Sequence, residues 1–412
     1  MESENLQFKL VFLYTGSKGF PLGDAYTNRI LSLAKGLIRT GVNVKIFIIY
    51  PGKDSRVVSK KGVFDQVPYE YLTPLRTSKN KVIKKLIGAK GIANTCYNLL
   101  TKDKNTDAII SFAESPVQNS IISFFAHLKK ILFIREANEY PKELLTKGKG
   151  GLSAFDDMKI RNSLKSLDGL ICISRSLKDY FQAEYSFKKP VLIIPIVVDK
   201  TRFGNEHIKI NDKYISYCGN LFGEKDGVDI LVKAFAKISL KHSFLRLKLI
   251  GDISNAIEFE KLKFLVNSLN ISDKVDFTGY LDRDEIPFHL INSYILVLAR
   301  PDNIQAQGGF PTKLGEYLAT SKPVVVTAVG DIPQFLKDGV NAFLALPGDV
   351  NSFSEKLTYV IENYSVAQKA GNEGHKLVDK DFSPDYQATR IVGFINGLAK
   401  TKEKNGSIFP VS

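Results

Sequence analysis

The chain has 412 residues, of which 44% are hydrophobic and 24% are charged, and its mean hydropathy is −0.07. This composition is typical of a folded globular protein, and it excludes disordered, collagen-like and membrane-embedded chains. Because one hydrophobic core rarely organises more than about 250 residues, the length predicts two or three domains. The net charge of +14 is uneven, since residues 1–205 carry +15 and residues 206–412 carry −1.

The cysteines and the N-terminal segment indicate the compartment. Cys96, Cys172 and Cys218 are an odd number of thiols without close spacing, so they predict neither a disulfide framework nor a zinc site. The first residues begin acidic and hold too short an apolar run for a signal peptide, and no stretch approaches the roughly 18 apolar residues of a membrane span. We expect a cytoplasmic protein that can associate peripherally with the inner face of the plasma membrane.

The first half of the chain alternates between strand and helix patterns. A strand over Phe8–Tyr14 leads through a glycine-rich loop into a helix over Tyr26–Arg39, which Gly41 ends, and a second strand follows over Val44–Tyr50. This order is a βαβ unit, which favours a parallel sheet with helices on both faces. Four further strands are predicted at Ala108–Phe112, Ile131–Ile134, Gly169–Ile173 and Val191–Val197.

The alternation starts again in the second half of the chain. Five strands are predicted there, at Tyr214–Cys218, Leu245–Ile250, Lys274–Phe277, Ile295–Ala299 and Pro323–Thr327. The fold class is therefore α/β, with two Rossmann-like domains of parallel strands. We place these domains at residues 1–200 and 206–384, with the linker near 199–210, a last amphipathic helix over 385–400 and a tail over 401–412.

The sharpest local pattern lies over Gly308–Thr327, GGFPTKLGEYLATSKPVVVT. Pro311 after two glycines is preorganised for helix entry, so a helix is predicted from about Thr312 to Ala319. Thr312 and Glu316 lie four residues apart and share a face of that helix. Its unpaired N-terminal amides, with Lys313 beside them, suit a phosphate group. The alternative is a core helix with a solvated glutamate and lysine.

That segment resembles the nucleotide-sugar signature of family 4 glycosyltransferases (glycosyl transferases group 1), which have the two-domain GT-B fold. The matching stretches are Phe310–Lys313, Glu316–Ala319 and Lys322–Val325. Three more segments resemble family motifs in the same order, namely the interdomain stretch Pro195–Phe203, the start of the second domain at Tyr217–Gly227 and the base-binding loop Phe277–Pro287. The resemblance covers nearly the whole chain, and it is strongest after residue 190. It also implies that the helix over 385–400 packs back on the N-terminal domain.

The resemblance implies the roles of the second-domain residues. It places Glu316 on the nucleotide ribose, Lys225 on the diphosphate, and the loop after Gly279, with Leu281, against the base. As a point cation, Lys225 would neutralise the charge that develops on the leaving diphosphate. Its alternative role is that of a solvated residue near a helix N-terminus. The other donor-binding residues implied are Gly23, Asn220, Gly308, Gly309, Phe310, Pro311, Thr312 and Lys313.

Two positions depart from the pattern of many family members. A glutamate is common where this chain has Gly308, and an arginine is common where it has Asn220. These departures remove one carboxylate near the donor sugar and one phosphate-binding cation. Related branches with the same Phe-Pro-x-Lys helix often lack both groups, so the resemblance still favours an enzyme.

The first domain holds the candidate acceptor-binding residues. Gly19, Gly23 and Asp24 lie on the loop after the first strand, where the family's glycine loop approaches the donor phosphate and the acceptor. The segment REANEYP resembles the family loop that holds an acidic residue before an aromatic residue and proline. It makes Glu136 a candidate for binding the acceptor, and it makes Glu139 a candidate catalytic residue with Lys225 and Glu316. A solvated acidic loop is the alternative.

A basic amphipathic stretch runs over Lys79–Lys90. Helical spacing places Val82, Ile83, Leu86 and Ile87 on one face, opposite Lys81, Lys84 and Lys85. This pattern is typical of a helix at an anionic membrane surface, and the alternative is an ordinary solvated helix. No nucleic-acid recognition motif accompanies the charge, so nucleic acid is not an expected partner.

The resemblance implies a retaining glycosyltransferase, of the hexosyltransferase type, that needs no metal and no cofactor. We predict transfer of a sugar from a nucleotide-sugar donor, preferably a uridine diphosphate sugar, to a hydroxyl of a surface polysaccharide, a lipopolysaccharide or a lipid-linked acceptor. The five histidines show no metal-ligand spacing, so no metal site is predicted. The alternatives are a nucleotide-sugar 2-epimerase, which shares the fold but needs acidic and histidine groups, and a non-catalytic nucleotide-sugar-binding protein.

Overall fold

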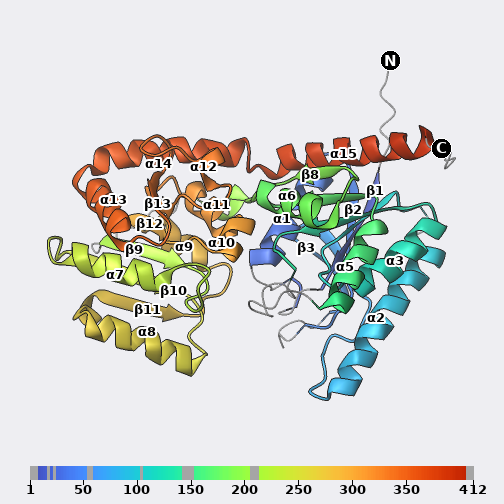
Figure 1. The fold of residues 1–412 in the computed structure, drawn as a ribbon, viewed down its shortest axis with the longest axis horizontal. Helices are drawn as coiled ribbons and strands as arrows, with labels where there is room; N and C mark the ends of the chain where they lie inside the picture. The colour runs from blue at the N-terminus through green and yellow to red at the C-terminus, as the bar shows by residue number, and fades with distance from the viewer. Residues whose placement is uncertain are drawn as a thin grey trace. The chain divides into compact units, whose positions relative to one another are not determined.

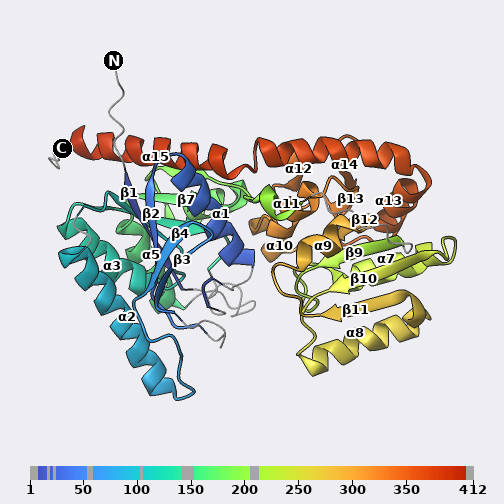
Figure 2. The same cartoon turned by 180° about the vertical axis from the view of Figure 1, so that it is seen from behind.

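The computed structural model describes residues 8–15, 19–21, 25–52, 59–102, 105–141, 153–204 and 213–404. The chain folds into two compact units. Unit 1 comprises Met1–Val197 together with Pro384–Ser412, and unit 2 comprises Val198–Ser383. Each unit is a largely parallel sheet covered by helices, as Figure 1 and Figure 2 show from opposite sides. The predicted α/β fold with two Rossmann-like domains is therefore confirmed.

The sheet of unit 1 has the strand order β3-β4-β2-β1-β5-β6-β7-β8. Its strands are β1 (Lys9–Tyr14), β2 (Asn43–Ile48), β3 (Lys61–Phe64), β4 (Val67–Tyr71), β5 (Ala108–Ser111), β6 (Leu132–Ala137), β7 (Gly169–Cys172) and β8 (Val191–Ile193). β3 pairs antiparallel with β4, and all other pairs are parallel. The predicted strands are present, but the β3–β4 hairpin was not predicted from the sequence.

The helices of unit 1 lie on both faces of this sheet (Figure 1). They are α1 (Ala25–Arg39), α2 (Lys81–Thr101), α3 (Pro116–Leu128), α5 (Ala154–Lys165), α6 (Arg175–Tyr185) and α15 (Pro384–Lys404). α3 packs between α2 and α5. The N-terminal part of α2 extends beyond its neighbours in both views, and its first ten residues are exposed or half-buried (Figure 2).

The C-terminal helix α15 packs against α1. Its apolar residues Ala388, Ile391, Ile395 and Leu398 join the hydrophobic core of unit 1. This packing accounts for the assignment of the chain's last helix to its first domain. The predicted helix over 385–400 is longer in the structure, and residues 405–412 of the predicted tail lie outside the described residues.

The sheet of unit 2 has the strand order β11-β10-β9-β12-β13-β14 and is parallel throughout. Its strands are β9 (Lys213–Cys218), β10 (Leu245–Ile250), β11 (Val275–Gly279), β12 (Ile295–Leu298), β13 (Val324–Thr327) and β14 (Phe343–Ala345). The first five match predicted strands, and β14, three residues long, was not predicted. In the two central strands, the last four residues of β9 and all of β12 are buried, as a sheet covered on both faces requires.

The helices of unit 2 include the one predicted most closely. They are α7 (Val228–Ser239), α8 (Ala256–Ser268), α9 (Ile286–Ile291), α10 (Ile304–Gly308), α11 (Thr312–Ala319), α12 (Ile332–Phe335), α13 (Val350–Glu362) and α14 (Tyr364–Asp379), with 3-10 turns η2 (Lys200–Arg202) and η3 (Ser272–Lys274). α11 has the predicted bounds. Pro311 is its N-cap rather than its first helical residue. Among the described residues, no helix is both long and apolar enough to cross a membrane.

Gly36 of α1 lies directly against the first residue of α15. A Cβ atom at this position would lie 2.6 Å from the carbonyl carbon of Pro384, so alanine requires the two helices to move apart. Gly397 of α15 is a matched control, because a Cβ there meets nothing within 4 Å. We expect Gly36→Ala to destabilise the protein by about 1–3 kcal/mol and Gly397→Ala to stabilise it by about 0.5–1 kcal/mol. Urea unfolding measures both, and equal effects would contradict the packing described.

Candidate functional site

Three segments meet at the carboxyl edge of the unit 2 sheet. They are the loop that follows β9, the loop that follows β12, and the start of α11. Ligands of open α/β sheets bind outside the carboxyl ends of the strands, so this edge is where the fold favours a site. The residues predicted to bind the nucleotide sugar lie on these three segments and on the loop after β11.

α11 is held on the sheet by its apolar face and by one buried hydroxyl. Leu314, Tyr317 and Leu318 are fully buried. The Tyr317 hydroxyl accepts a hydrogen bond from the Cys218 amide at 2.8 Å, so it fixes the helix to the end of β9. Burial raises the pKa of Tyr317 well above its usual value, which keeps this hydroxyl protonated.

A buried ion pair joins the start of α11 to the loop after β9. The Lys313 ammonium lies 2.5 Å from Asp226 Oδ2 and 3.0 Å from the Tyr217 hydroxyl, which donates to Asp226 at 2.9 Å. Burial lowers the pKa of Lys313 although Asp226 opposes that shift. For Asp226, burial raises the pKa, but the neighbouring Lys313 and Arg300 outweigh it, and the pKa lies below its usual value.

Gly219 makes room for this ion pair. A Cβ atom at position 219 would contact the Lys313 ammonium and would lie 2.8 Å from the Tyr217 hydroxyl. The glycine in the loop after β9 is therefore needed for the approach of Lys313. A larger residue there would displace the ammonium from Asp226.

Arg300 extends the network to the loop after β12 and is fully buried. Its Nε lies 3.7 Å from Asp226 Oδ1. The guanidinium donates hydrogen bonds to the carbonyls of Lys225, at 3.4 Å, and Gly309, at 3.0 Å. One side chain therefore fixes the backbone of two predicted donor-binding segments.

Glu316 lies on the face of α11 opposite the core and is paired with Arg202. The distance from Glu316 Oε1 to Arg202 Nη1 is 2.7 Å, and 15% and 11% of the two side chains are exposed. Arg202 also donates to the Arg283 carbonyl at 2.9 Å, on the loop after β11. Asp199 Oδ1 accepts from the Thr201 amide at 3.1 Å and so caps η2, which carries Arg202.

The remaining predicted donor-side residues lie around this network. Lys225 is half-buried beside Asp226, and Asn220 is exposed, with Oδ1 accepting from the Phe222 amide at 3.2 Å. Leu281 is half-buried on the loop between β11 and α9. Gly308 ends α10, and Phe310 is buried against Phe335 and Phe382. The Thr312 side chain is half-buried at the first position of α11.

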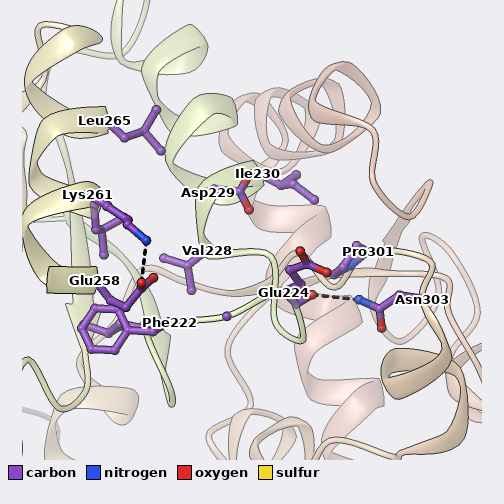
Figure 3. A pocket seen from close by; sticks show the side chains of 13 residues that line it. Phe222, Glu224, Val228, Asp229, Ile230, Glu258, Lys261, Leu265, Pro301 and Asn303 are labelled. Carbon is purple, nitrogen blue, oxygen red and sulfur yellow. Dashed lines mark hydrogen bonds and ion pairs between the residues drawn. The ribbon is translucent and has the colours of Figure 1, made fainter. Parts of the chain in front are cut away.

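A pocket opens beside the loop after β9, between α7 and α8 (Figure 3). Two interactions cross its rim, the Lys261–Glu258 ion pair at 2.7 Å and the hydrogen bond from Asn303 to the Glu224 carbonyl at 3.0 Å. Its lining is mixed, with apolar residues Leu221, Val228, Ile230, Leu262 and Leu265 beneath the polar rim. It is separate from the Lys313–Asp226 pair, since neither residue lines it.

In unit 1, a second pocket lies at the carboxyl ends of β5 and β6. It is lined by Tyr26, Glu114, Ser115, Pro116, Arg135, Glu136, Ala137, Asn138, Glu139, Tyr140, Pro141 and Ile160. The structure therefore brings Glu136 and Glu139 into one pocket. Glu139 is exposed there, whereas Glu136 is almost completely buried.

Glu136 is engaged by two residues of α1. Its Oε1 lies 2.9 Å from Arg29 Nε, and its Oε2 accepts from the Tyr26 hydroxyl at 3.2 Å. Arg29 also donates to the carbonyls of Ile194, at 2.8 Å, and Pro195. Burial and the nearby carboxylate of Glu136 raise the pKa of Tyr26 well above its usual value, so Tyr26 stays a donor. A substrate hydroxyl would have to share Glu136 with these partners.

The loop after β1 contains the other predicted first-domain residues. Gly19 is buried with φ of 102°, a conformation that favours glycine. Gly23 and Asp24 lie outside the described residues. In the part of the chain that the structure describes, no group of three or more His, Cys, Asp or Glu side chains could hold a metal ion.

The sequence interpretation missed four residues of the donor side, namely Arg202, Tyr217, Asp226 and Arg300. Three of them, Tyr217, Asp226 and Arg202, lie inside segments that resemble family motifs, so the sequence did indicate that these segments belong to the site. Arg300 gave one signal, an arginine directly after a fully apolar strand, where a buried cation needs a carboxylate partner. None of these signals identified the partner.

The Asp226 ion pair makes the stability of unit 2 depend on pH. Because the pKa of Asp226 is lowered in the fold, its stabilisation is present above the unfolded pKa of about 3.9 and is lost as the pH falls further. Asp226→Asn leaves Lys313 and Arg300 uncompensated, so we expect a loss of about 3 kcal/mol at pH 7 and a shallower decline of stability below pH 4. The control is Asp229→Asn, since Asp229 is exposed. Urea unfolding of unit 2 at several pH values checks this, and parallel pH profiles would contradict it.

Comparison with known families assigns the second unit. Residues 199–377 match the family model described as glycosyl transferases group 1. An uncharacterised glycosyltransferase of Methanocaldococcus jannaschii is 28% identical over 56% of this chain and 63% of its own. A capsular polysaccharide biosynthesis glycosyltransferase of Staphylococcus aureus is 24% identical over 48% of this chain and 50% of its own. The chain thus spans half to under two thirds of the lengths of these curated relatives.

Solved structures match nearly the whole chain. Sucrose-phosphate synthase from Thermosynechococcus elongatus has a TM-score of 0.76 at 15% identity, covering 96% of this chain and 100% of its own. The HepE protein of Anabaena, in complex with UDP and glucose, has a TM-score of 0.70 at 16% identity, covering 94% and 99%. At these identities the likeness establishes the fold. Residues 199–377 thus resemble the glycosyl transferases group 1 family, and the chain has the two-domain GT-B fold of these solved structures.

Proposed function

We propose that the protein is a retaining glycosyltransferase that moves a sugar from a uridine diphosphate sugar to a hydroxyl of a surface glycan or a lipid-linked acceptor. The observation that carries this proposal is the buried Arg300–Asp226–Lys313 network, which fixes the predicted diphosphate-binding segments in the unit with the family match. The choice of uridine is supported by the structural neighbour from Anabaena, which was solved with UDP and with UDP-glucose.

The donor diphosphate would bind at the start of α11 and beside Lys225. The first amides of α11 have no helical acceptor, and they favour a negative charge together with the helix dipole. Arg300 holds the carbonyls of Gly309 and Lys225, so both segments are preorganised before the donor arrives. Groups that are already in place cost no reorganisation when charge develops on the leaving diphosphate.

Lys313 would hold the phosphate-binding segments in place and would not contact the phosphate itself. Its ammonium is held by Asp226 and Tyr217, and all three groups are mostly buried. Because the Lys313 ammonium is already bound by Asp226 and Tyr217, Lys225 is the better candidate for direct contact with the diphosphate. Departure of the sugar would leave its electron pair on the diphosphate oxygen, and that phosphate would take the proton of the attacking acceptor hydroxyl.

Glu316 would bind the ribose of the donor. A carboxylate can accept hydrogen bonds from two vicinal hydroxyls, and Arg202 fixes its orientation at 2.7 Å. Arg202 also contacts the loop after β11, which the family resemblance assigns to the base. We therefore propose that Arg202 fixes the position of Glu316 in the ribose subsite and of the loop in the base subsite.

The acceptor proposal rests on the surface of unit 1. The exposed residues of α3 are Val117, Ile121, Phe124 and Leu128, all large and apolar, and the helix contains no Asp, Glu, Lys or Arg. The neighbouring α2 exposes Val82, Leu86 and Tyr97 beside Lys81, Lys84 and Lys85. Apolar side chains flanked by lysines suit an anionic lipid surface. The capsular polysaccharide relative supports the same class of acceptor.

Glu316→Gln tests the donor site. The substitution keeps the size of the side chain but removes its charge, so ribose hydrogen bonds weaken by about 2 kcal/mol, or about thirtyfold in Kd. We expect this loss for UDP in calorimetric titration, together with slower sugar transfer. The control is Glu373→Gln, because Glu373 is exposed and pairs with Lys376 on the surface. Unchanged UDP affinity would refute the ribose assignment, and binding without transfer would favour a non-catalytic binding protein.

A lysine-to-serine triple variant at positions 81, 84 and 85 tests the membrane surface. Each lysine near an anionic bilayer contributes about 1 kcal/mol, so we expect vesicle binding to weaken about a hundredfold. Sedimentation with phosphatidylserine vesicles measures this, and the same substitutions at Lys233, Lys261 and Lys376 of unit 2 are the control. Phe124→Ser should also weaken binding, but without changing its salt dependence. If all variants sediment equally, the surface has another role.

A further inference from the structure

The pocket of unit 1 contains a buried arginine that no other part of the site explains. Arg135 lies on β6, where it pairs in register with Ser111 of β5 and Leu170 of β7. Only 6% of the residue is exposed, and it lines the pocket together with Tyr26, Glu114, Glu136 and Glu139. The carboxyl ends of β5 and β6 are where a ligand of this sheet would bind.

The guanidinium of Arg135 lacks an anionic partner in the described part of the chain. Among the residues that the structure describes, nothing accepts a hydrogen bond from its buried Nε. The guanidinium carbon lies 5.9 Å from the centre of the Phe181 ring. Burial lowers the pKa of Arg135, although nearby acidic groups oppose the shift. An unpaired buried cation destabilises a fold, so its presence here points to a ligand.

The three carboxylates that line the pocket do not serve as the anionic partner of Arg135. Glu136 is occupied by Arg29 at 2.9 Å and by the Tyr26 hydroxyl at 3.2 Å. Glu114 and Glu139 are exposed residues, so they lie on the open side of the pocket. The pocket thus has a cation in its buried part and carboxylates in its exposed part. This polarity favours a ligand with a negative group at one end and hydroxyls at the other.

We propose that this pocket binds an acceptor sugar that carries a carboxylate, such as a hexuronic acid unit. The Arg135 guanidinium would bind the carboxylate with two parallel hydrogen bonds, a geometry that guanidinium and carboxylate share. Glu114 and Glu139 would accept hydrogen bonds from the sugar hydroxyls. The proposal deepens the proposed function, because it names the class of acceptor that a glycosyltransferase of this chain would use.

A carboxylate fits the charges better than a phosphate does. Glu114, Glu136 and Glu139 surround the arginine, and a phosphate monoester carries nearly two negative charges near pH 7. A second negative charge in this pocket would be repelled by the two exposed glutamates. A neutral sugar is disfavoured for a different reason, since it would displace water from the guanidinium without supplying an anionic partner.

The test uses the full chain and three probes, namely methyl β-glucuronide, methyl β-glucoside and glucose 6-phosphate. Saturation-transfer NMR and calorimetric titration measure binding of each. We expect the glucuronide to bind at least tenfold more tightly than the other two. Arg135→Met should abolish that preference, and Arg161→Gln, which changes a surface arginine paired with Asp157, should preserve it. Equal binding of all three probes, or a preference for glucose 6-phosphate, would overturn the proposal.

Thermal unfolding separates a ligand-binding role from a structural one. If Arg135 is kept for a ligand, Arg135→Met removes an unpaired buried charge, so the free protein should keep or raise its Tm. A Tm several degrees lower with the glucuronide preference intact would overturn the proposal. UDP affinity is measured on the same samples, because the UDP site is assigned to unit 2. If the wild-type protein does not bind UDP, the proposed donor site is refuted. The glucuronide result then still decides whether the pocket of unit 1 binds a carboxylate sugar.

Discussion

The ion pair between Lys313 and Asp226 is the interaction on which the donor side of unit 2 depends. It joins the start of α11 to the loop after β9, and Arg300 connects the same carboxylate to the loop after β12. Two cations on one carboxylate are costly to bury, and a well-packed apolar core would often be more stable. This arrangement fixes the positions of two loops, since Arg300 donates hydrogen bonds to the carbonyls of Lys225 and Gly309. Segments that lie far apart in sequence are thereby held in one geometry.

Unit 1 also contains a buried ion pair between an arginine and a carboxylate. Arg29 pairs with Glu136 and binds the carbonyls of Ile194 and Pro195, so it ties α1 and β6 to the segment that leads out of the unit. Arg135, one residue before Glu136, has no such partner among the described residues. The neighbouring strand positions therefore hold one carboxylate that is bound by an arginine and one arginine for which we propose a ligand. Both arginines are buried, so the two differ in their partners and not in their exposure.

Local patterns predicted the elements well, because each depends on neighbours in sequence. The bounds of α11 follow from two glycines, a proline and an apolar stripe, and the strands follow from short runs of β-branched residues. The networks could not be predicted in this way. Asp226 and Arg300 lie 74 positions apart, and either residue alone resembles an ordinary loop charge. The exposed face of α3 was also hidden, because the helix buries Gln118, Asn119 and Ser123 and exposes apolar residues, which is the reverse of the pattern expected for a surface helix. The strands β3, β4 and β14 lie at or next to a sheet edge and are short, and short strands give little periodicity.

The uneven charge of the chain can be assigned to particular side chains. In unit 2, the cations of the donor side lie against carboxylates, namely Lys313 and Arg300 against Asp226 and Arg202 against Glu316, so their charge is partly neutralised. In unit 1, Lys81, Lys84 and Lys85 are exposed, and none of them forms an ion pair with another described residue. The Debye length at physiological ionic strength is about 8 Å, so distant charges are screened and only such clustered cations act on an approaching surface. The apolar side chains of α3 respond to salt far less than these lysines do. A surface that combines both would retain part of its affinity in salt, whereas a purely electrostatic one would not.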